Sequence, residues 1–364
     1  MAKGKMTVLL GLSGGVDSSV AAILLKNEGY DVIGAFMKNY SDSKNELTGD
    51  CAYKDERDMA LRIAYLLDIK FVTLDFEDAY KSKVIDPMFR SYSKGQTPNP
   101  DIECNSIIKF PLLWKSAKKL KADYIATGHY ARIKKTKRGY SLLKGKDKEK
   151  DQSYFLSGLT QDDLSHTLFP IGEYTKDEIR SIAKKNNFPN FNKRSTRGIC
   201  FVGKTDIQDF LKQRIKEQYG TILSPEGIEI GSHNGSMFYT IGQKIGDNDK
   251  ISLNKPRSLS QKRWYVAKKE KGNIIIAAPE GHPLLMQKMV RLKDFHRINP
   301  KVKLPLISLK ARIRHRGELY SGKLLKKGKD WSFIFKSPVS SIASGQYLVI
   351  YDKDELIASG EIVL

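Results

Sequence analysis

The chain has 364 residues, of which 40% are hydrophobic and 10% aromatic, so it can bury ordinary cores, and a wholly disordered chain is excluded. That length predicts about two or three domains. Lys and Arg total 63 against 41 Asp and Glu, and the formal charge of +22 favours nucleic acid as partner over an anionic membrane surface, although a lysine-rich proteome would also explain it.

The first half of the chain alternates strand and helix patterns. This alternation predicts parallel βαβ units and a doubly wound α/β sheet. The apolar start leads directly into a glycine turn, so it is interpreted as a first strand and not as a signal peptide, and no run reaches the ~20 apolar residues of a membrane span. Strands are predicted over 7–11, 32–37, 71–75 and 123–127, and helices over 17–27, 55–67 and 107–120.

After about residue 210, turn signals multiply and short β-rich runs follow one another. They predict a small central β-rich domain and then a C-terminal β-barrel. The predicted domains are 1–209, 210–284 and 285–364. The strands are expected over 237–241, 264–267, 274–277, 306–313, 331–335, 347–351 and 357–363. The charged stretch 134–150, interrupted by Gly139, predicts a basic β-hairpin that is either simply solvated or in contact with RNA.

The sharpest motif follows the first strand and opens the first helix. Its small residues let the backbone approach a phosphate, and free N–H groups at a helix start point at the anion. It is not the GxxxxGK[ST] loop, because the lysine is missing, and it is not the GxGxxG turn either. A merely tight turn is the alternative. The motif comprises Gly11, Leu12, Ser13, Gly14, Gly15, Val16, Asp17, Ser18 and Ser19, with Ser13 and Ser18 as hydroxyl donors.

The pattern SGGxDS at 13–18 resembles the PP-loop of ATP pyrophosphatases. These enzymes cleave ATP between the α- and β-phosphates and adenylate a substrate oxygen. The resemblance implies an adenine nucleotide α-hydrolase-like fold in which the loop holds pyrophosphate. It also makes Asp17 a candidate for orienting Mg²⁺.

Cys104 follows two prolines in the segment TPNPDIECN, residues 97–105. The prolines are expected to exclude helix before Asn105 and to place the thiol near a helix N-terminus, where the dipole favours thiolate. Asp101 is a candidate acid or base. The alternative is that Cys104 is a small buried hydrophobe.

Cys200 lies in GICFVG, residues 198–203. Arg194 and Arg197 would favour its thiolate, while burial among apolar neighbours would oppose it; a core cysteine is the alternative. Cys51, in a predicted loop, is given no role. Three cysteines argue against a disulfide framework and for a reducing compartment, so a cytoplasmic location is expected.

Further motifs extend along most of the chain in a fixed order. Together with the loop GLSGGVDSS they resemble the bacterial and mitochondrial tRNA-specific 2-thiouridylases, which replace the 2-oxygen of a tRNA wobble uridine with sulfur. The motifs are TPNPDIECN with KF at 109–110, ATGHYAR at 126–132, KDQSYFL at 150–156, GICFVG at 198–203, YTIGQK at 239–244 and RWYVA at 263–267.

The resemblance implies a definite route. ATP adenylates the C2 oxygen and pyrophosphate leaves. Cys200 carries sulfur from a donor protein as a persulfide, that sulfur attacks C2, and AMP departs. Cys104 then attacks the persulfide as a nucleophile, which frees sulfide or leaves a Cys104–Cys200 disulfide. The implied partners are the tRNAs for lysine, glutamate and glutamine and a persulfide-carrying protein, and a monomer is expected.

The resemblance also implies contact residues beyond the loop. Met37 and Gly128 are expected to contact the adenosine through backbone groups, whereas His129 is expected to be structural or nucleotide-adjacent. Asn99, Pro100 and Asp101 match the segment that meets the target base. The expected tRNA contacts are Lys150, Asp151, Gln152, Arg314 and His315, the last two with a solvated strand face as alternative.

The chain departs from the family pattern at three places, and rival interpretations remain. An acidic residue is usual in the family at the region that here holds Arg194, Ser195 and Thr196, and Gln243-Lys244 replaces Gln-Arg. The turn 343–346 reads Ala-Ser-Gly-Gln instead of Pro-Gly-Gln, and this difference is expected to affect a turn and not the chemistry.

The rival functions are another PP-loop adenylating enzyme or ligase without a persulfide, and a non-enzymatic RNA-binding module. An Fe–S cluster on Asp101, Cys104 and Cys200 is possible but not favoured.

Overall fold

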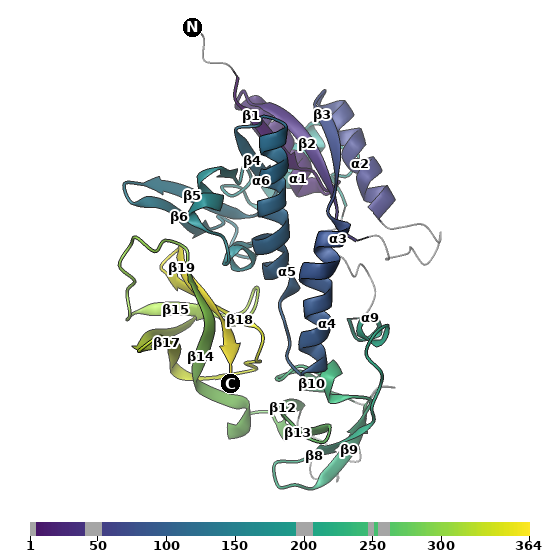
Figure 1. The fold of residues 1–364 in the computed structure, drawn as a ribbon, viewed down its shortest axis with the longest axis vertical. Helices are drawn as coiled ribbons and strands as arrows, with labels where there is room; N and C mark the ends of the chain where they lie inside the picture. Colours follow the sequence, from purple (N-terminus) through teal and green to yellow (C-terminus); the bar gives the residue numbers. More distant parts are fainter. Residues whose placement is uncertain (1–4, 41–52, 194–206, 247–250, 254–262) are drawn as a thin grey trace.

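The N-terminal part of the chain is built on a five-stranded parallel sheet. The computed structural model describes residues 5–40, 53–193, 207–246, 251–253 and 263–364 (Figure 1). The strand order is β3-β2-β1-β4-β7, and every neighbouring pair is parallel. The strands are β1 (Thr7–Gly11), β2 (Asp31–Lys38), β3 (Lys70–Asp75), β4 (Tyr124–Thr127) and β7 (Thr167–Leu168).

Helices cover both faces of this sheet. Side chains of β1 alternate between the faces, so Val8 and Leu10 pack with α1, α2 and α8, while Leu9 packs with α6 on the other side. The predicted doubly wound α/β architecture is therefore confirmed. The helices are α1 (Val16–Asn27), α2 (Tyr53–Leu66), α8 (Lys176–Lys185) and α6 (Phe110–Lys119).

Two helical runs lead from the sheet toward the rest of the molecule, and each contains a π-helical stretch. The first is α3 (Glu77–Tyr80), a π-helical turn (Lys81–Ile85) and α4 (Asp86–Ser93). The second is α5 (Pro100–Glu103), a π-helical turn (Cys104–Lys109) and α6. Short helices elsewhere are η3 (Ser153–Leu156), α7 (Gln161–Ser165), α9 (Ile207–Lys212) and η6 (Pro283–Leu285).

A mixed six-stranded sheet forms the central part, in the order β10-β12-β13-β8-β9-β11. The prediction of a strand over 237–241 is wrong. That segment begins with the 3₁₀ turn η4 (Ser236–Phe238), and Phe238 and Tyr239 are both buried, whereas a strand would turn neighbouring side chains to opposite faces. The strands are β8 (Gly220–Leu223), β9 (Glu229–His233), β10 (Lys244–Ile245), β11 (Ile251–Leu253), β12 (Trp264–Glu270) and β13 (Ile274–Pro279).

The C-terminal part is a closed antiparallel barrel of six strands, which confirms the predicted barrel. The order β14-β17-β16-β15-β18-β19 closes because β14 also pairs with β19. Phe333, Phe335, Leu348 and Ile350 fill its core. The strands are β14 (Met286–Arg297), β15 (Leu309–Arg312), β16 (Tyr320–Lys327), β17 (Asp330–Ser340), β18 (Tyr347–Asp352) and β19 (Glu355–Val363).

The predicted basic hairpin is present as β5 (Ala131–Thr136) and β6 (Gly139–Lys144). Strand β6 pairs with β19, with Leu142 opposite Leu356 and Leu143 opposite Glu355. The hairpin therefore extends the barrel sheet to eight strands and joins the N-terminal part to the barrel (Figure 1). In the described ranges no helix is long and apolar enough to cross a membrane.

Candidate active site

The glycine-rich loop follows β1 at the carboxyl edge of the parallel sheet, where ligands of open α/β sheets bind. Gly14 has a φ of 71°, and a Cβ there would lie 2.3 Å from the Glu56 carbonyl oxygen. The Ser18 hydroxyl accepts from the Ser13 backbone N–H at 3.2 Å and donates to the Gly15 carbonyl at 3.0 Å. The loop is thus closed on itself, and only glycine fits its tightest point.

Met37 and Gly128 are brought to the same edge as the loop. A Cβ on Gly11 would lie 3.2 Å from the Met37 Cε, and one on Gly128 would lie 2.8 Å from the Ser18 backbone nitrogen. The carboxyl ends of β1, β2 and β4 therefore lie close together at this edge of the sheet. Leu12 and Val16 are buried, so only their backbone can face a ligand.

Asp17, the candidate Mg²⁺ residue, has two partners that sequence reasoning missed. Its Oδ1 accepts from the Lys176 ammonium at 2.6 Å and from the Tyr130 hydroxyl at 2.7 Å. Burial, and then the Asp17 charge, raise the pKa of Tyr130, which stays protonated and donates. The capping box of Thr175 and Glu178 indicates where α8 starts, but no local signal brings Lys176 to Asp17.

A Mg²⁺ ion held mainly by nucleotide phosphates needs only one or two protein carboxylates. Asp17 fits that requirement with its second oxygen, Oδ2. Among the described residues, no group of three His, Cys, Asp or Glu side chains is placed to hold a metal ion.

Asn190 is a third residue that the sequence did not reveal. Its Nδ2 donates to the Gly14 carbonyl and contacts the Ser19 hydroxyl, both at 3.0 Å. Asn190 is buried, and its Oδ1 has no hydrogen-bond partner in the described part of the chain. The segment after α8 thus holds the loop through these two hydrogen bonds.

His129 lies beside Gly128 but is packed as a structural residue. Its Nδ1 is 2.7 Å from the Thr127 hydroxyl, and its ring packs against Phe110 and Phe169. Burial, and secondarily Lys109, hold the pKa of His129 well below its usual range, so the ring is neutral. These contacts agree with the structural role expected for it.

The helix that carries Cys104 begins earlier than predicted. Pro100 takes the first helical position, where a missing N–H costs nothing, and the Asn99 Oδ1 caps the helix by accepting from the Ile102 N–H at 3.2 Å. The expectation that the two prolines exclude helix is therefore wrong. Cys104 lies one turn inside and begins the π-helical stretch.

Cys104 is a free thiol that is only 7% exposed. Burial raises its pKa; Lys109 and a hydrogen bond from Tyr80 lower it, and Asp101 raises it. The expectation of a thiolate at a helix N-terminus is therefore wrong for this structure, because burial has the largest effect on the pKa of Cys104 and favours the neutral thiol. Cys51 and Cys200 lie outside the described residues, as do Arg194, Ser195 and Thr196, so the Cys104–Cys200 pair stays a prediction.

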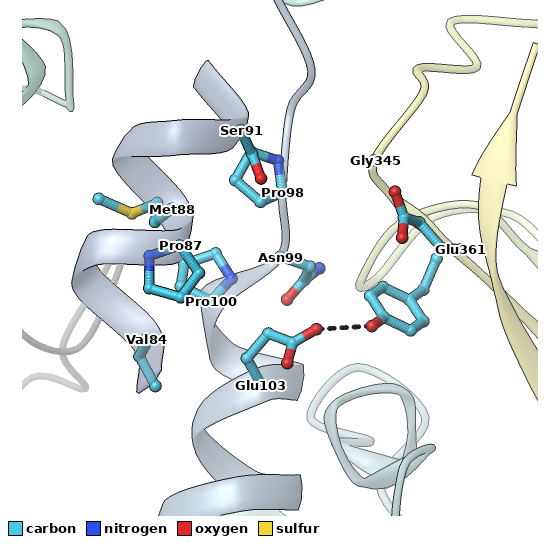
Figure 2. Close-up of a pocket in the computed structure, with 11 residues that line it drawn as sticks. Val84, Pro87, Met88, Ser91, Pro98, Asn99, Pro100, Glu103, Gly345 and Glu361 are labelled. Atoms are coloured by element: carbon cyan, nitrogen blue, oxygen red, sulfur yellow. Dashed lines mark hydrogen bonds between the residues drawn. The ribbon is translucent and has the colours of Figure 1, made fainter. Parts of the chain in front are cut away.

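A cavity of about 170 Å³ lies between α4, the segment 98–103 and the barrel (Figure 2). One wall is apolar and the other polar, and Asn99 and Pro100 line it. The Tyr347 hydroxyl donates to Glu103 Oε1 at 2.6 Å, the contact dashed in Figure 2. The remaining lining residues are Val84, Pro87, Met88, Ser91, Pro98, Gly345 and Glu361.

The expected tRNA contacts divide into inward and outward side chains. Asp151 is 1% exposed and accepts from Arg312 at 2.6 Å, and the Gln152 Oε1 accepts from the Tyr130 N–H. Arg314 is exposed and Lys150 half-buried. His315 packs on Phe155 with ring centres 4.2 Å apart, and burial, followed by Arg316, lowers its pKa to about 4.

Lys109 acts electrostatically on both Cys104 and His129 and lowers the pKa of each. His129 directly follows Gly128 at the edge of the loop. The same positive charge therefore acts on the candidate nucleophile and on a residue beside the candidate nucleotide site.

Comparisons with known proteins match nearly the whole chain. Family models match as a tRNA methyl transferase HUP domain over 6–204, a tRNA methyl transferase PRC-barrel domain over 208–278 and an aminomethyltransferase β-barrel domain over 287–362. The tRNA-specific 2-thiouridylase MnmA 1 of Geobacillus kaustophilus is 41% identical over 358 residues, 98% of this chain and 95% of that protein.

Two further relatives carry the same description. The tRNA-specific 2-thiouridylase MnmA of Coxiella burnetii strain CbuK_Q154 is 39% identical over 357 residues, 97% of this chain and 94% of that protein. That of Christiangramia forsetii is 36% identical over 400 residues, 98% and 99% of the two chains.

Proposed function

Because this chain belongs to the family of tRNA-specific 2-thiouridylases, we propose that it catalyses the ATP-dependent 2-thiolation of the wobble uridine of tRNA. The observation that carries the proposal is the closed glycine-rich loop at the carboxyl edge of the parallel sheet, where Gly14 has a φ of 71° and the Ser13 N–H donates to the Ser18 hydroxyl. A thiolation by way of an adenylate needs a nucleotide and a thiol at one centre. The positive charge of Lys109, which acts on Cys104, would stabilise negative charge that develops on sulfur.

In the first half of the reaction, the C2 oxygen of uridine attacks the α-phosphorus of ATP and the bond to the β-phosphate breaks. Backbone N–H groups of Gly11, Leu12, Ser13, Gly14, Gly15, Val16, Asp17 and Ser18 would bind the leaving pyrophosphate, and Met37 and Gly128 the adenosine. Mg²⁺, when bound at Asp17, would neutralise phosphate charge. The target base would meet Asn99 and Pro100 at the cavity of Figure 2, together with Asp101, which follows them in the chain.

In the second half, the terminal sulfur of a Cys200 persulfide attacks C2 and AMP leaves with the former 2-oxygen. That attack leaves C2 joined to Cys200 through an S–S bond. The Cys104 sulfur then attacks the Cys200 sulfur of this bond, which forms a Cys104–Cys200 disulfide and releases 2-thiouridine. Asp101 would take the proton of the Cys104 thiol. The role of Cys200 rests on the family resemblance.

The three parts of the chain divide the work in this proposal. Residues 1–209 carry the chemistry, 210–284 form the central part, and 285–364 hold tRNA through Arg314 and His315, with Lys150 on the neighbouring segment. In this proposal the substrates are the tRNAs for lysine, glutamate and glutamine, and the sulfur comes from a persulfide-carrying protein. The enzyme works in the cytoplasm as a monomer.

Reconstitution with tRNA, ATP, Mg²⁺ and a persulfide-carrying protein tests the proposal. We expect 2-thiouridine, measured by nucleoside mass spectrometry, to form in step with AMP and pyrophosphate. A Cys200→Ser variant that kept full activity would favour a PP-loop enzyme without a persulfide. Iron in anaerobically purified active protein would instead support a cluster on Asp101, Cys104 and Cys200.

A further inference from the structure

The segment that leads to Cys104 is held in place by the C-terminal barrel. Gln346, directly before β18, donates from its Nε2 to the Thr97 carbonyl at 3.0 Å and to the Pro98 carbonyl at 3.2 Å. Its Oε1 accepts from the Asn99 Nδ2 at 3.3 Å. One side chain therefore binds three successive residues that lie nearly 250 positions away in the sequence.

The same barrel turn closes on the segment with its backbone. The Thr97 N–H donates to the Ser344 carbonyl at 3.0 Å. Gly345 has a φ of 90°, and a Cβ there would lie 3.0 Å from both the nitrogen and the oxygen of Thr97. The turn 343–346 thus fits against this segment with no room for a side chain, so its effect is not confined to the barrel.

Residues 97–100 have few backbone groups left to form hydrogen bonds within their own segment. Pro98 and Pro100 have no N–H to donate, and both the N–H and the carbonyl of Thr97 are used by the barrel. Asn99 performs two tasks with one amide, since its Oδ1 caps the Ile102 N–H while its Nδ2 is held by Gln346. The orientation of this cap, and with it the start of the helix that carries Cys104, depends on the barrel.

We propose that Gln346 is a positioning residue of the reaction, which sets from the barrel the orientation of Asn99 and the helix start that bears Cys104. The inference rests on the proposed function. It makes the barrel part of the catalytic centre as well as a holder of tRNA. Supporting residues of this kind matter because a misplacement of about 1 Å at a reacting group can cost ~100-fold in rate.

The chain offers a closely matched control in Gln161. The Gln161 Nε2 donates to the Tyr140 carbonyl at 2.8 Å and to the Ile298 carbonyl of the barrel region at 2.9 Å, and its Oε1 accepts from the Tyr140 N–H at 2.8 Å. Gln161→Ala therefore removes the same number of hydrogen bonds, one of which joins the N-terminal part to the barrel region. It does so without touching residues 97–104.

The experiment compares Gln346→Ala, Gln346→Met and Gln161→Ala in the full-length protein. We expect both Gln346 variants to lower kcat for thiolation about tenfold or more, with the Kd values for tRNA and ATP within about twofold of the original. We expect Gln161→Ala to keep kcat within about twofold. Equal losses of kcat in all three variants, or a loss in tRNA affinity alone, would overturn the proposal.

Amide hydrogen exchange gives a second measurement that needs no catalysis. Peptides covering residues 97–104 are expected to exchange faster in Gln346→Ala than in the original protein and Gln161→Ala. Unchanged exchange there would contradict the positioning role even if thiolation were normal. If the original protein made no 2-thiouridine, the proposed function would fail while the exchange result still decided the role of Gln346.

Discussion

The ammonium of Lys176 lies 2.6 Å from a carboxylate oxygen of Asp17, although the two residues are 159 positions apart in the sequence. The nucleotide loop has no lysine of its own, and α8 delivers one to the helix that follows the loop. The side chain of Lys176 is only 8% exposed, so its charge acts in a poorly solvated place. The pair keeps a carboxylate beside the candidate phosphate site without leaving its charge unbalanced.

Lys176→Met is expected to weaken ATP binding roughly tenfold, about 1.4 kcal/mol, because an unbalanced Asp17 would repel the phosphates. Calorimetric titration with ATP measures the change. Lys146→Met is the control, since its contact with Glu178 on the same helix is solvent-exposed. Equal affinities in the original protein and Lys176→Met would contradict the prediction.

Gly128→Ala is expected to damage the nucleotide site directly. The new Cβ would lie 2.8 Å from the Ser18 nitrogen and 2.9 Å from the Asp17 carbonyl carbon, so the start of α1 must shift. We expect ATP affinity to fall at least about tenfold, with ~1–3 kcal/mol lost from the free energy of unfolding. Gly246→Ala, whose Cβ would meet no atom of the described residues within 4 Å, should leave both quantities unchanged.

Cys104→Ala and Cys200→Ala are each expected to abolish thiolation and to leave ATP binding intact, because the nucleotide loop uses neither sulfur. Single-turnover assays with mass spectrometry of the tRNA product measure the first effect, and ATP titration the second. Normal thiolation by either variant would contradict the mechanism.

Acid is expected to destabilise the fold through buried histidines. The unfolded His315 binds a proton near pH 6.5, while in the folded protein its pKa is about 4, so protonation favours the unfolded chain. The stability is complete above about pH 6.5 and is lost progressively toward about pH 4. His129, also held neutral by burial, acts in the same direction.

Urea unfolding at about pH 7.5 and about pH 5 checks this prediction. We expect the loss of stability at the lower pH to be smaller in His315→Phe, which keeps the ring contact with Phe155 but cannot bind a proton. An identical loss in the variant would show that His315 does not contribute.

The affinity for tRNA is expected to fall as salt rises, since Lys and Arg displace counterions from phosphates. Arg314→Ala should reduce the slope of log Kd against log salt by about one and weaken binding to all tRNAs alike. Filter binding over a range of KCl concentrations gives the slope. An affinity independent of salt would refute the interpretation of the +22 charge.

The sheet and the loop could be predicted from sequence because their signals are local. Apolar runs of strand length and amphipathic helices alternate, and the glycines at Gly14 and Gly15 sit at the strand-to-helix junction. The helix before Cys104 cannot be predicted from the two prolines alone, because Pro100 occupies the first helical turn, where proline is tolerated, and Asn99 supplies the cap.

The contacts that complete the site could not be predicted, because each joins residues that are distant in the chain. Lys176 and Asn190 reach the loop from beyond position 170, and Gln346 reaches Asn99 from the barrel. The burial of Asp151 is similar, because its partner Arg312 lies 161 positions away.

Nucleoside mass spectrometry of tRNA tests the central claim most directly, in cells that lack this protein and then regain it. The account predicts that 2-thiouridine at the wobble position disappears without the protein, returns with the original sequence, and does not return with a stably expressed Cys104→Ala variant. Undiminished 2-thiouridine in the cells that lack it, or full recovery with Cys104→Ala, would contradict the account.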